Sequence, residues 1–186
     1  LQDELGLEVK SHKASLLVEP WELKTKTGGI YKVFTPFWKS IRASLNPGQP
    51  LPKPALVAGS NQAEGQSLES LGLLPTKPDW SGGFAPVWTP GEAGARQRLE
   101  EFLATGLEGY KELRNRPDME KVSRLSPHLR FGEISPRQVW AVASGGQAPM
   151  QWSGDLDSFL SEIVWREFSY SLLYHYPDLQ TQNWKP

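Results

Sequence analysis

The chain contains no cysteine, which excludes disulfide bonds, thiolate metal sites and cysteine nucleophiles over its 186 residues. It also lacks any apolar run near the roughly 20 residues that a membrane-spanning helix requires, and no signal-peptide pattern opens it. Neither sign of charge dominates, since 20 basic residues stand against 21 acidic ones. We therefore expect a cytoplasmic protein without membrane association, and the net charge argues neither for nor against a nucleic-acid partner.

Metal and nucleophile motifs are absent as well. The three histidines, His12, His128 and His175, show no metal-ligand spacing, so each is interpreted as structural and no metal site is expected. No glycine-rich nucleotide loop and no nucleophile elbow occurs. By contrast, eight tryptophans is a high count for this length. Some of them belong to a core, but an aromatic excess also suits flat ligands and bases.

Composition divides the chain into regions 1–40, 41–88 and 89–186. The first region runs from a charged segment into a short apolar one, Ala14 to Val18, which predicts a strand arriving at a sheet. Glycine and proline punctuate residues 25–90 so densely that we expect no helix of useful length there. The middle region is interpreted as an interdomain connector. Because the chain starts at Leu1 with too little sheet to stand alone, we expect it to be a segment of a longer protein.

The region from residue 89 onward has the signatures of helices. Thr89, Pro90 and Glu92 predict a cap, a proline at the first helical position and a completing glutamate. Apolar residues then recur at close to helical period as far as Leu113, with Gly106 as a candidate break.

Two Ser-Pro pairs, Ser126-Pro127 and Ser135-Pro136, predict two further helix starts, and Gln138 completes a capping box with Ser135. We expect helices near 127–131, 136–143 and 156–175. The C-terminal half is therefore predicted to be all-α.

The segment FLSEIVWREF places charged side chains in a helix that is otherwise apolar nearly all round. At about 100° per residue, Phe159, Glu162, Trp165 and Arg166 share one side of this helix. A buried charge is costly unless a partner meets it. An internal Glu162–Arg166 ion pair at i,i+4 is one solution, and a ligand beside the stacking face of Trp165 is the other. Glu167 points elsewhere and is expected to cap or brace a neighbouring helix.

The segment SRLSP sets two hydroxyls, Ser123 and Ser126, around Arg124 just before a proline-started helix. Such a segment can cradle a phosphate, although an ordinary helix cap is the commoner use of the same residues.

The preceding helix ends with Tyr110, Arg114 and Arg116. The two arginines could simply stabilise the negative end of the helix dipole. Alternatively, Tyr110 could contact a ligand and an arginine could contact a DNA phosphodiester.

Together these segments resemble the DNA photolyase/cryptochrome family. YKVFTPFWK, from Tyr31 to Lys39, is similar to the family's link after its antenna domain, VSRLSPHLRFGEIS to its flavin-phosphate motif, and EIVWREF to its usual ELIWREF. The likeness covers most of the chain except the 45–88 connector. It implies an α+β multidomain fold: the end of an N-terminal Rossmann-like α/β antenna domain in 1–40, a connector in 41–88, and the first part of an all-α FAD-binding domain in 89–186.

The resemblance also implies roles for individual residues. Contacts to FAD or its phosphates are expected from Tyr110, Val122, Ser123, Arg124, Leu125, Ser126, Phe159 and Arg166. Contacts to UV-damaged DNA are expected from Arg114, Glu162, Trp165 and Arg166. Glu162 and Trp165 are the expected catalytic residues, because they would face a flipped-out pyrimidine dimer. Excited reduced flavin would pass an electron to the dimer, Glu162 would stabilise the radical anion, and Trp165 would stack on a base.

Two departures from the family pattern stand in these motifs. Val122 replaces a common threonine, so only its backbone N–H could serve, and Phe159 replaces a tryptophan seen in some members.

We also expect that the later helices of the flavin pocket lie beyond Pro186. The segment alone should therefore be inactive and bind FAD weakly or not at all. An antenna pigment, methenyltetrahydrofolate or deazaflavin, is expected in sequence preceding residue 1, and the whole protein is expected to be a monomer.

Three functions remain open at this point. Light-driven repair of cyclobutane pyrimidine dimers by a deoxyribodipyrimidine photo-lyase is favoured because the Glu162–Trp165 pair is intact, whereas plant-type photoreceptors tend to lose this combination. A cryptochrome blue-light photoreceptor without repair activity is the alternative. A helical binding module without a cofactor would explain the capped helices but not the coincidence of motifs.

Overall fold

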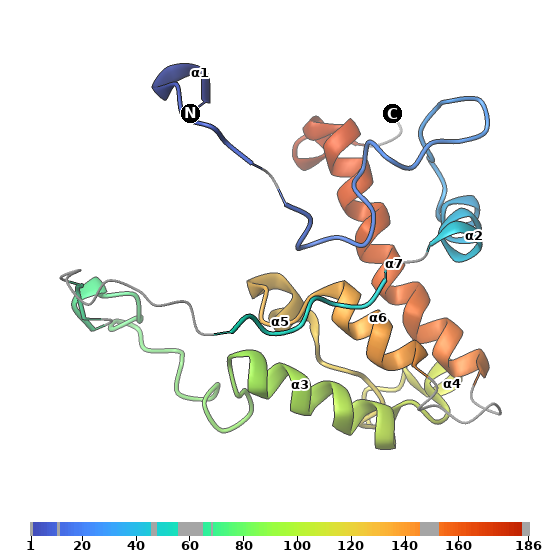
Figure 1. Cartoon of the computed structure of the whole chain (residues 1–186). Helices are drawn as coiled ribbons and strands as arrows, with labels where there is room; N and C mark the ends of the chain where they lie inside the picture. The colour runs from blue at the N-terminus through green and yellow to red at the C-terminus, as the bar shows by residue number, and fades with distance from the viewer. Residues whose placement is uncertain are drawn as a thin grey trace.

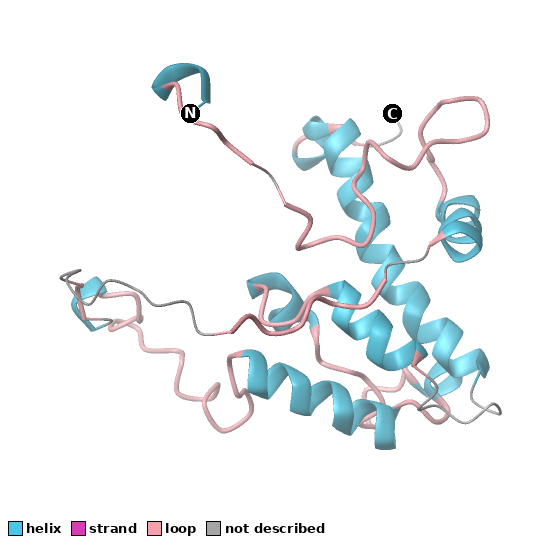
Figure 2. Ribbon diagram, in the orientation of Figure 1, coloured by secondary structure: helices cyan, strands magenta, loops and turns pink. Residues whose placement is uncertain are grey.

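The computed structural model describes residues 2–10, 12–45, 48–55, 65–67, 69–145 and 153–183. Within these ranges the chain forms helices and loops and no strand (Figure 2). The longest helix, α7 (Ser153–His175), crosses the body of the molecule, and several of the other helices pack along it (Figure 1). This architecture confirms the all-α character expected of the C-terminal half. The Rossmann-like domain stays a prediction, as does the division into three regions.

The N-terminal segment begins with α1 (Gln2–Leu5), which lies apart from the body (Figure 1). The strand predicted from Ala14 to Val18 is wrong. The backbone N–H groups of Leu17 and Val18 donate to Oε2 of Glu167, at 2.7 and 3.3 Å, instead of to a neighbouring strand. The carboxylate of Glu167 on α7 thus accepts the backbone hydrogen bonds that a neighbouring strand would have accepted in a sheet.

A helix also forms where glycine and proline were expected to prevent one. Helix α2 (Phe34–Ser44) carries Pro36 within its first turn, where a missing backbone N–H costs nothing. Its apolar face buries Phe37 and Ile41 against Val164 and Phe168 of α7. Tertiary packing of an amphipathic face therefore outweighs the unfavourable composition on either side of α2.

The region after residue 89 folds as helix α3 (Glu92–Glu101), a π-helical turn η2 (Phe102–Gly106) and helix α4 (Tyr110–Leu113). The predicted cap at Thr89 is wrong, because Gly91, with φ 96°, occupies the N-cap and no side chain bonds there. The break expected at Gly106 is confirmed, since the π-helical turn ends at this residue.

The two Ser-Pro pairs behave differently. Helix α6 (Pro136–Ser144) starts with the predicted capping box, in which Ser135 and Gln138 bond reciprocally. Helix α5 (Ser126–Phe131) has Leu125 as its N-cap and no side-chain cap bond, so the capping role predicted for Ser126 is wrong.

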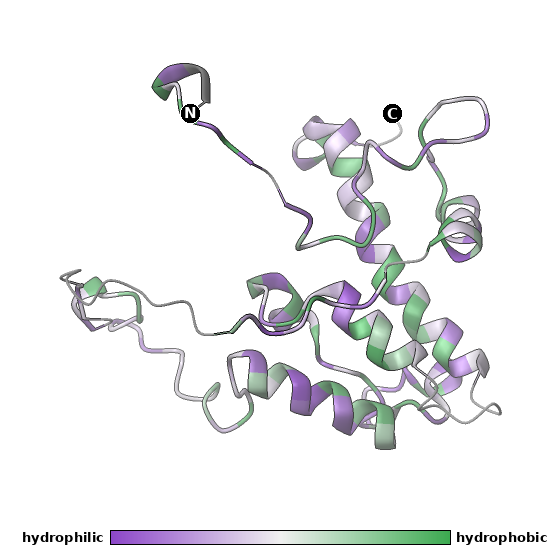
Figure 3. Ribbon diagram, viewed as in Figure 1, coloured by the Kyte–Doolittle hydropathy of each residue, from purple (hydrophilic) through white to green (hydrophobic). Residues whose placement is uncertain are grey.

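Two short 3₁₀ segments, η1 (Glu69–Leu71) and η4 (Pro177–Gln180), complete the described elements. The main core lies between α3, η2, α4, α5, α6 and α7, and a second cluster joins α2 to α7. Hydrophilic and hydrophobic residues alternate along α3 and α7 as expected for helices with one buried side (Figure 3). No helix in the described ranges is long and apolar enough to cross a membrane.

Candidate functional site

A cavity of about 680 Å³ opens between α4, the loop leading into α5, and α7. Its wall combines residues from three stretches that are far apart in the sequence. They are Tyr110, Val122, Ser123, Arg124, Leu125, Ser126, Leu129, Arg130, Phe159, Glu162, Ile163, Arg166 and Tyr170. All eight residues expected to contact the cofactor lie on this wall together with Glu162, whereas Arg114 and Trp165 do not line it.

Hydrogen bonds between α7 and the start of α4 hold Tyr110 on its side of the cavity. Asp155 accepts from the N–H groups of Gly109 and Lys111, at 3.0 and 2.8 Å. The Tyr110 ring meets Phe159 edge-on, with 5.9 Å between centroids. Burial raises the pKa of Tyr110 above its ordinary value. Its hydroxyl therefore stays protonated at neutral pH and can donate a hydrogen bond.

The loop 122–126 has an unusual backbone. Arg124 adopts φ 53°, a left-handed conformation that no other non-glycine residue of the described ranges adopts. Leu125 follows at φ −83° and ψ −8°. An αL residue next to an αR residue turns consecutive N–H groups to the same side, and such concavities bind anions. Strained backbone of this kind clusters at functional sites.

Lys121 braces this loop by donating to the carbonyl oxygens of Thr105 and Glu108, at 2.9 and 3.0 Å. Among the residues that the structure describes, the side-chain hydroxyls of Ser123 and Ser126 bond to no other protein group. Both hydroxyls are therefore available to a ligand in the cavity.

Glu162 forms an ion pair with Arg114, which directly follows α4. The guanidinium of Arg114 also lies 5.9 Å from the ring centroid of Tyr110, and the hydrogen bond to Glu162 raises the pKa of Arg114. The hypothesis of an i,i+4 ion pair between Glu162 and Arg166 is therefore wrong. The side chain of Glu162 is 35% exposed, so its carboxylate lies at the mouth of the cavity and is not enclosed by hydrocarbon as expected.

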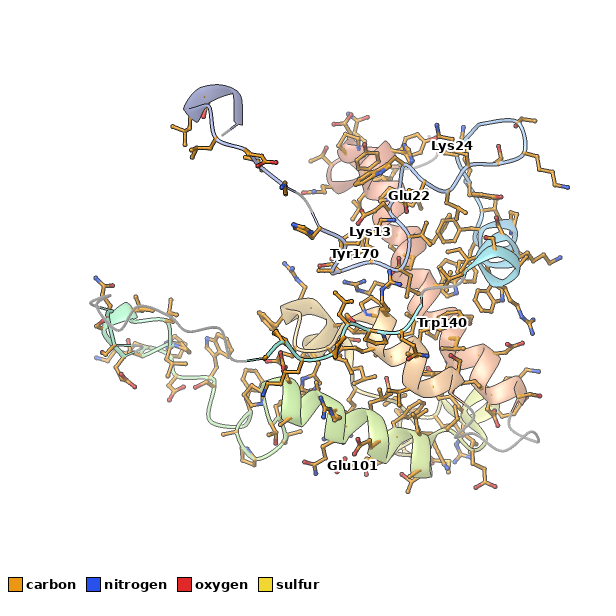
Figure 4. All side chains as sticks on the ribbon, in the orientation of Figure 1. Lys13, Glu22, Lys24, Glu101, Trp140 and Tyr170 are labelled. Carbon is orange, nitrogen blue, oxygen red and sulfur yellow. The ribbon has the colours of Figure 1, made fainter. Side chains whose placement is uncertain are left out.

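Arg166 turns toward the N-terminal segment. Its Nη1 donates to the carbonyl oxygen of Ser15 at 2.6 Å and lies 3.5 Å from Oε1 of Glu167. Its guanidinium stacks on the ring of Tyr170 at 4.8 Å, and Tyr170 is labelled in Figure 4 beside that segment. Arg166 thus joins the cavity wall to the segment that crosses α7.

Glu167 does not cap or brace a helix, so that expectation is wrong. It is buried and holds the N-terminal segment through the bonds from Leu17 and Val18 described above. Burial raises its pKa to about 7, against the opposing effect of those two hydrogen bonds and of Arg166. The carboxyl therefore titrates near neutral pH.

Trp165 stands on α7 next to this site, one turn after Glu162. The indole is 43% exposed. It stacks on Phe34 at the start of α2, with 3.6 Å between ring centroids and 10° between planes. Phe34 lies in the segment from Tyr31 to Lys39, which was expected only to link two domains.

Four cavity residues were missed from the sequence: Leu129, Arg130, Ile163 and Tyr170. Helical spacing could have found all four. Each follows an expected contact by four residues, since Leu129 follows Leu125, Arg130 follows Ser126, Ile163 follows Phe159 and Tyr170 follows Arg166. No group of three or more potential metal ligands occurs in the described ranges.

The family model described as DNA photolyase matches residues 1–55. A deoxyribodipyrimidine photo-lyase of Agrobacterium fabrum is 46% identical over 96% of the chain and 37% of its own length. The photo-lyase of a Synechococcus species is 37% identical over 88% of the chain and 35% of its own length. Cryptochrome-2 of Arabidopsis thaliana is 30% identical over 97% of the chain and 31% of its own length.

A crystal structure of a class III photolyase from Agrobacterium tumefaciens superposes with a TM-score of 0.90. Its sequence is 44% identical, and the match covers 99% of the chain and 38% of that protein. The chain therefore spans between 31% and 38% of the length of these four relatives. Over nearly its whole length, the chain is therefore similar to members of the DNA photolyase/cryptochrome family, and it shares the fold of one of them.

Proposed function

We propose that the chain is part of a deoxyribodipyrimidine photo-lyase, which uses light and FAD to split cyclobutane pyrimidine dimers in DNA. The observation that carries the proposal is the single cavity that gathers Tyr110, loop 122–126, Phe159, Glu162 and Arg166. These residues come from separate sequence motifs; Glu162 was expected at the damaged DNA and the others at the cofactor. The relatives named photo-lyase are also more similar to the chain than the cryptochromes are.

The cavity residues suit FAD in size and chemistry. About 680 Å³ is within the range of small-molecule sites, which spans roughly 300–1,000 Å³. Apolar side chains such as Leu125, Leu129 and Ile163 suit a flat ring system. Arginines, unpaired serine hydroxyls and the concave loop suit a pyrophosphate. Ser123, Ser126 and the loop N–H groups would hold the phosphates, while Tyr110 and Phe159 would bound the ring.

Bound reduced FAD would supply, on excitation, the electron that opens the dimer, and this electron would return to the flavin once the ring is split. The chain's own residues would orient the lesion. Glu162 would stabilise the developing negative charge of the damaged base by donating a hydrogen bond or a proton, which requires the neutral carboxyl in place of the carboxylate paired with Arg114. Arg114 would hold Glu162 in position and meet a DNA phosphate. Trp165 would stack on an unstacked base.

The proposal also covers features of the whole protein. It includes a Rossmann-like antenna domain that binds methenyltetrahydrofolate or deazaflavin, the connector 41–88, and a monomer that acts on UV-damaged DNA in the cytoplasm. The connector is only partly described, since residues 46–47, 56–64 and 68 lie outside the described ranges. The similarity to the photo-lyases named above supports this part of the proposal.

The test is light-dependent repair by the full-length protein purified with its flavin. We expect it to split thymine dimers in an oligonucleotide under near-UV or blue light. Glu162→Ala should slow ring opening by roughly ten- to a hundredfold, because a hydrogen bond to a charged group contributes about 1.5–3 kcal/mol. Its flavin content should stay normal.

Asp118→Ala is the matched control, because Asp118 is also paired with an arginine, Arg116, but does not line the cavity. It should leave the repair yield unchanged. Full flavin binding without any repair by the unmodified protein would instead identify a cryptochrome-type photoreceptor. Loss of flavin in Glu162→Ala would make Glu162 a structural residue.

A further inference from the structure

The stack between Phe34 and Trp165 joins two elements with different expected roles. Phe34 lies in YKVFTPFWK, a segment expected only to link domains, whereas Trp165 is one of the two expected catalytic residues. Their centroid distance of 3.6 Å and interplanar angle of 10° make this the closest and most nearly parallel ring pair in the described ranges. Most aromatic pairs in proteins are offset or edge-to-face, so this arrangement calls for a reason.

The stack is held in place from the Phe34 side. Phe34 begins α2, and the next turn of α2 buries Phe37 against Phe168 at 5.1 Å between centroids. Phe168 also meets Phe34 and Trp165 edge-on, at 5.9 and 5.8 Å. Ile41, one turn further along α2, is fully buried. The docking of α2 on α7 therefore fixes where the Phe34 ring lies.

One face of the indole is covered and the other is not. Phe34 lies against the first face and Phe168 against an edge, yet Trp165 remains 43% exposed. The exposed area must therefore lie on the opposite face and the remaining edge. Glu162 stands one turn earlier on the same helix and lines the cavity.

Without this contact, a half-exposed tryptophan could rotate between rotamers. The stacking of a base would then carry the entropic cost of fixing the indole in one rotamer. Fixing a binding group in advance strengthens binding by removing that cost. We propose that Phe34 is a positioning residue for Trp165. It fixes the plane of the indole so that the open face receives an unstacked base beside Glu162. This inference rests on the proposed function and adds a residue from the linking segment to the lesion site.

The test compares variants of the full-length flavin-loaded protein for binding of one oligonucleotide with and without a single thymine dimer. Phe34→Leu keeps an apolar side chain but removes the ring. We expect it to weaken binding of the dimer about three- to tenfold, the effect of one aromatic pair, with undamaged DNA and flavin content unaffected. Phe34→Tyr should restore the affinity. Phe37→Leu is the matched control, since Phe37 packs in the same cluster on Phe168 but has no ring contact with Trp165.

A double-mutant cycle separates positioning from support of the fold. In a Trp165→Ala background, Phe34→Leu should have no further effect on dimer binding, because its target is gone. An equal loss in both backgrounds, an unchanged preference for the dimer in Phe34→Leu, or loss of flavin in that variant would overturn the inference. If Trp165→Ala alone leaves the preference unchanged, the stacking role within the proposed function fails, and the inference fails with it.

Discussion

Replacing Glu167 with glutamine removes a buried charge while keeping the hydrogen bonds that attach the N-terminal segment to α7. Glu167 is 2% exposed, and both bonds from Leu17 and Val18 reach the same atom, Oε2. The amide oxygen of glutamine can accept those bonds. Glu167→Gln therefore imitates the protonated carboxyl, which also keeps one oxygen free to accept.

The size and sign of the effect follow from the pKa. Burial raises the pKa of Glu167 from 4.5 to about 7, so between these pH values the folded chain binds more protons than the unfolded chain. The free energy of unfolding must then fall as the pH rises from about 4.5 to about 7. A shift of this size corresponds to about 3 kcal/mol, at about 1.4 kcal/mol for each pKa unit. The glutamine variant lacks this dependence.

The assay is urea unfolding of the unmodified full-length protein and of Glu167→Gln, at about pH 5 and about pH 8. Taking the difference between the two proteins at each pH cancels the titration of all other groups. We expect the variant to gain stability relative to the unmodified protein as the pH rises, by up to about 3 kcal/mol. Glu167→Ala, which leaves the Leu17 donor unsatisfied, should be about 1–3 kcal/mol less stable than Glu167→Gln at both pH values. The same difference at both pH values for Glu167→Gln would refute a raised pKa.

The remaining predictions concern DNA binding, the cofactor and the fold. Arg114→Ala in the full-length protein should weaken binding of damaged and undamaged DNA alike and lower the salt slope of binding by about one; an unchanged slope would argue against a phosphate contact. Ser126→Ala should weaken FAD binding about fivefold, the effect of one hydrogen bond of about 1 kcal/mol, and fluorescence titration with FAD would contradict this if the affinity stayed the same. Gly94→Ala should strongly lower the melting temperature, because the new Cβ would lie 1.9 Å from the carbonyl oxygen of Thr89. Its control Gly154→Ala, in open space on α7, should change stability by no more than about 1 kcal/mol.

Local sequence rules predicted the parts of the fold that depend on local chemistry. The box between Ser135 and Gln138 requires only two side chains three residues apart, and it starts α6 as expected. The apolar pattern that ends near His175 likewise predicted α7 to within a few residues. The cavity wall was predictable in part because loop 122–126 and α7 each carry their contacts within one short motif.

Long-range contacts account for the errors. The stretch from Ala14 to Val18 has the composition of a strand, but its donors find an acceptor on Glu167, about 150 residues away in the sequence. Helix α2 forms because Phe37 and Ile41 pack on an apolar face of α7, and no residue near α2 in the sequence indicates that contact. In both cases tertiary packing overrides local propensity.

The ion pair of Glu162 shows that a tertiary contact also replaces a local one within the site. Helix spacing allows Glu162 to reach Arg166, yet an exposed i,i+4 pair stabilises a helix by only about 0.3–0.5 kcal/mol. That gain is small enough for tertiary geometry to redirect both residues. Arg114 approaches Glu162 from α4, which Asp155 fixes to α7, and Arg166 is drawn to Ser15 by a 2.6 Å bond to its carbonyl oxygen. Separating the two charges in this way leaves Glu162 on the cavity wall, with 35% of its side chain exposed to solvent.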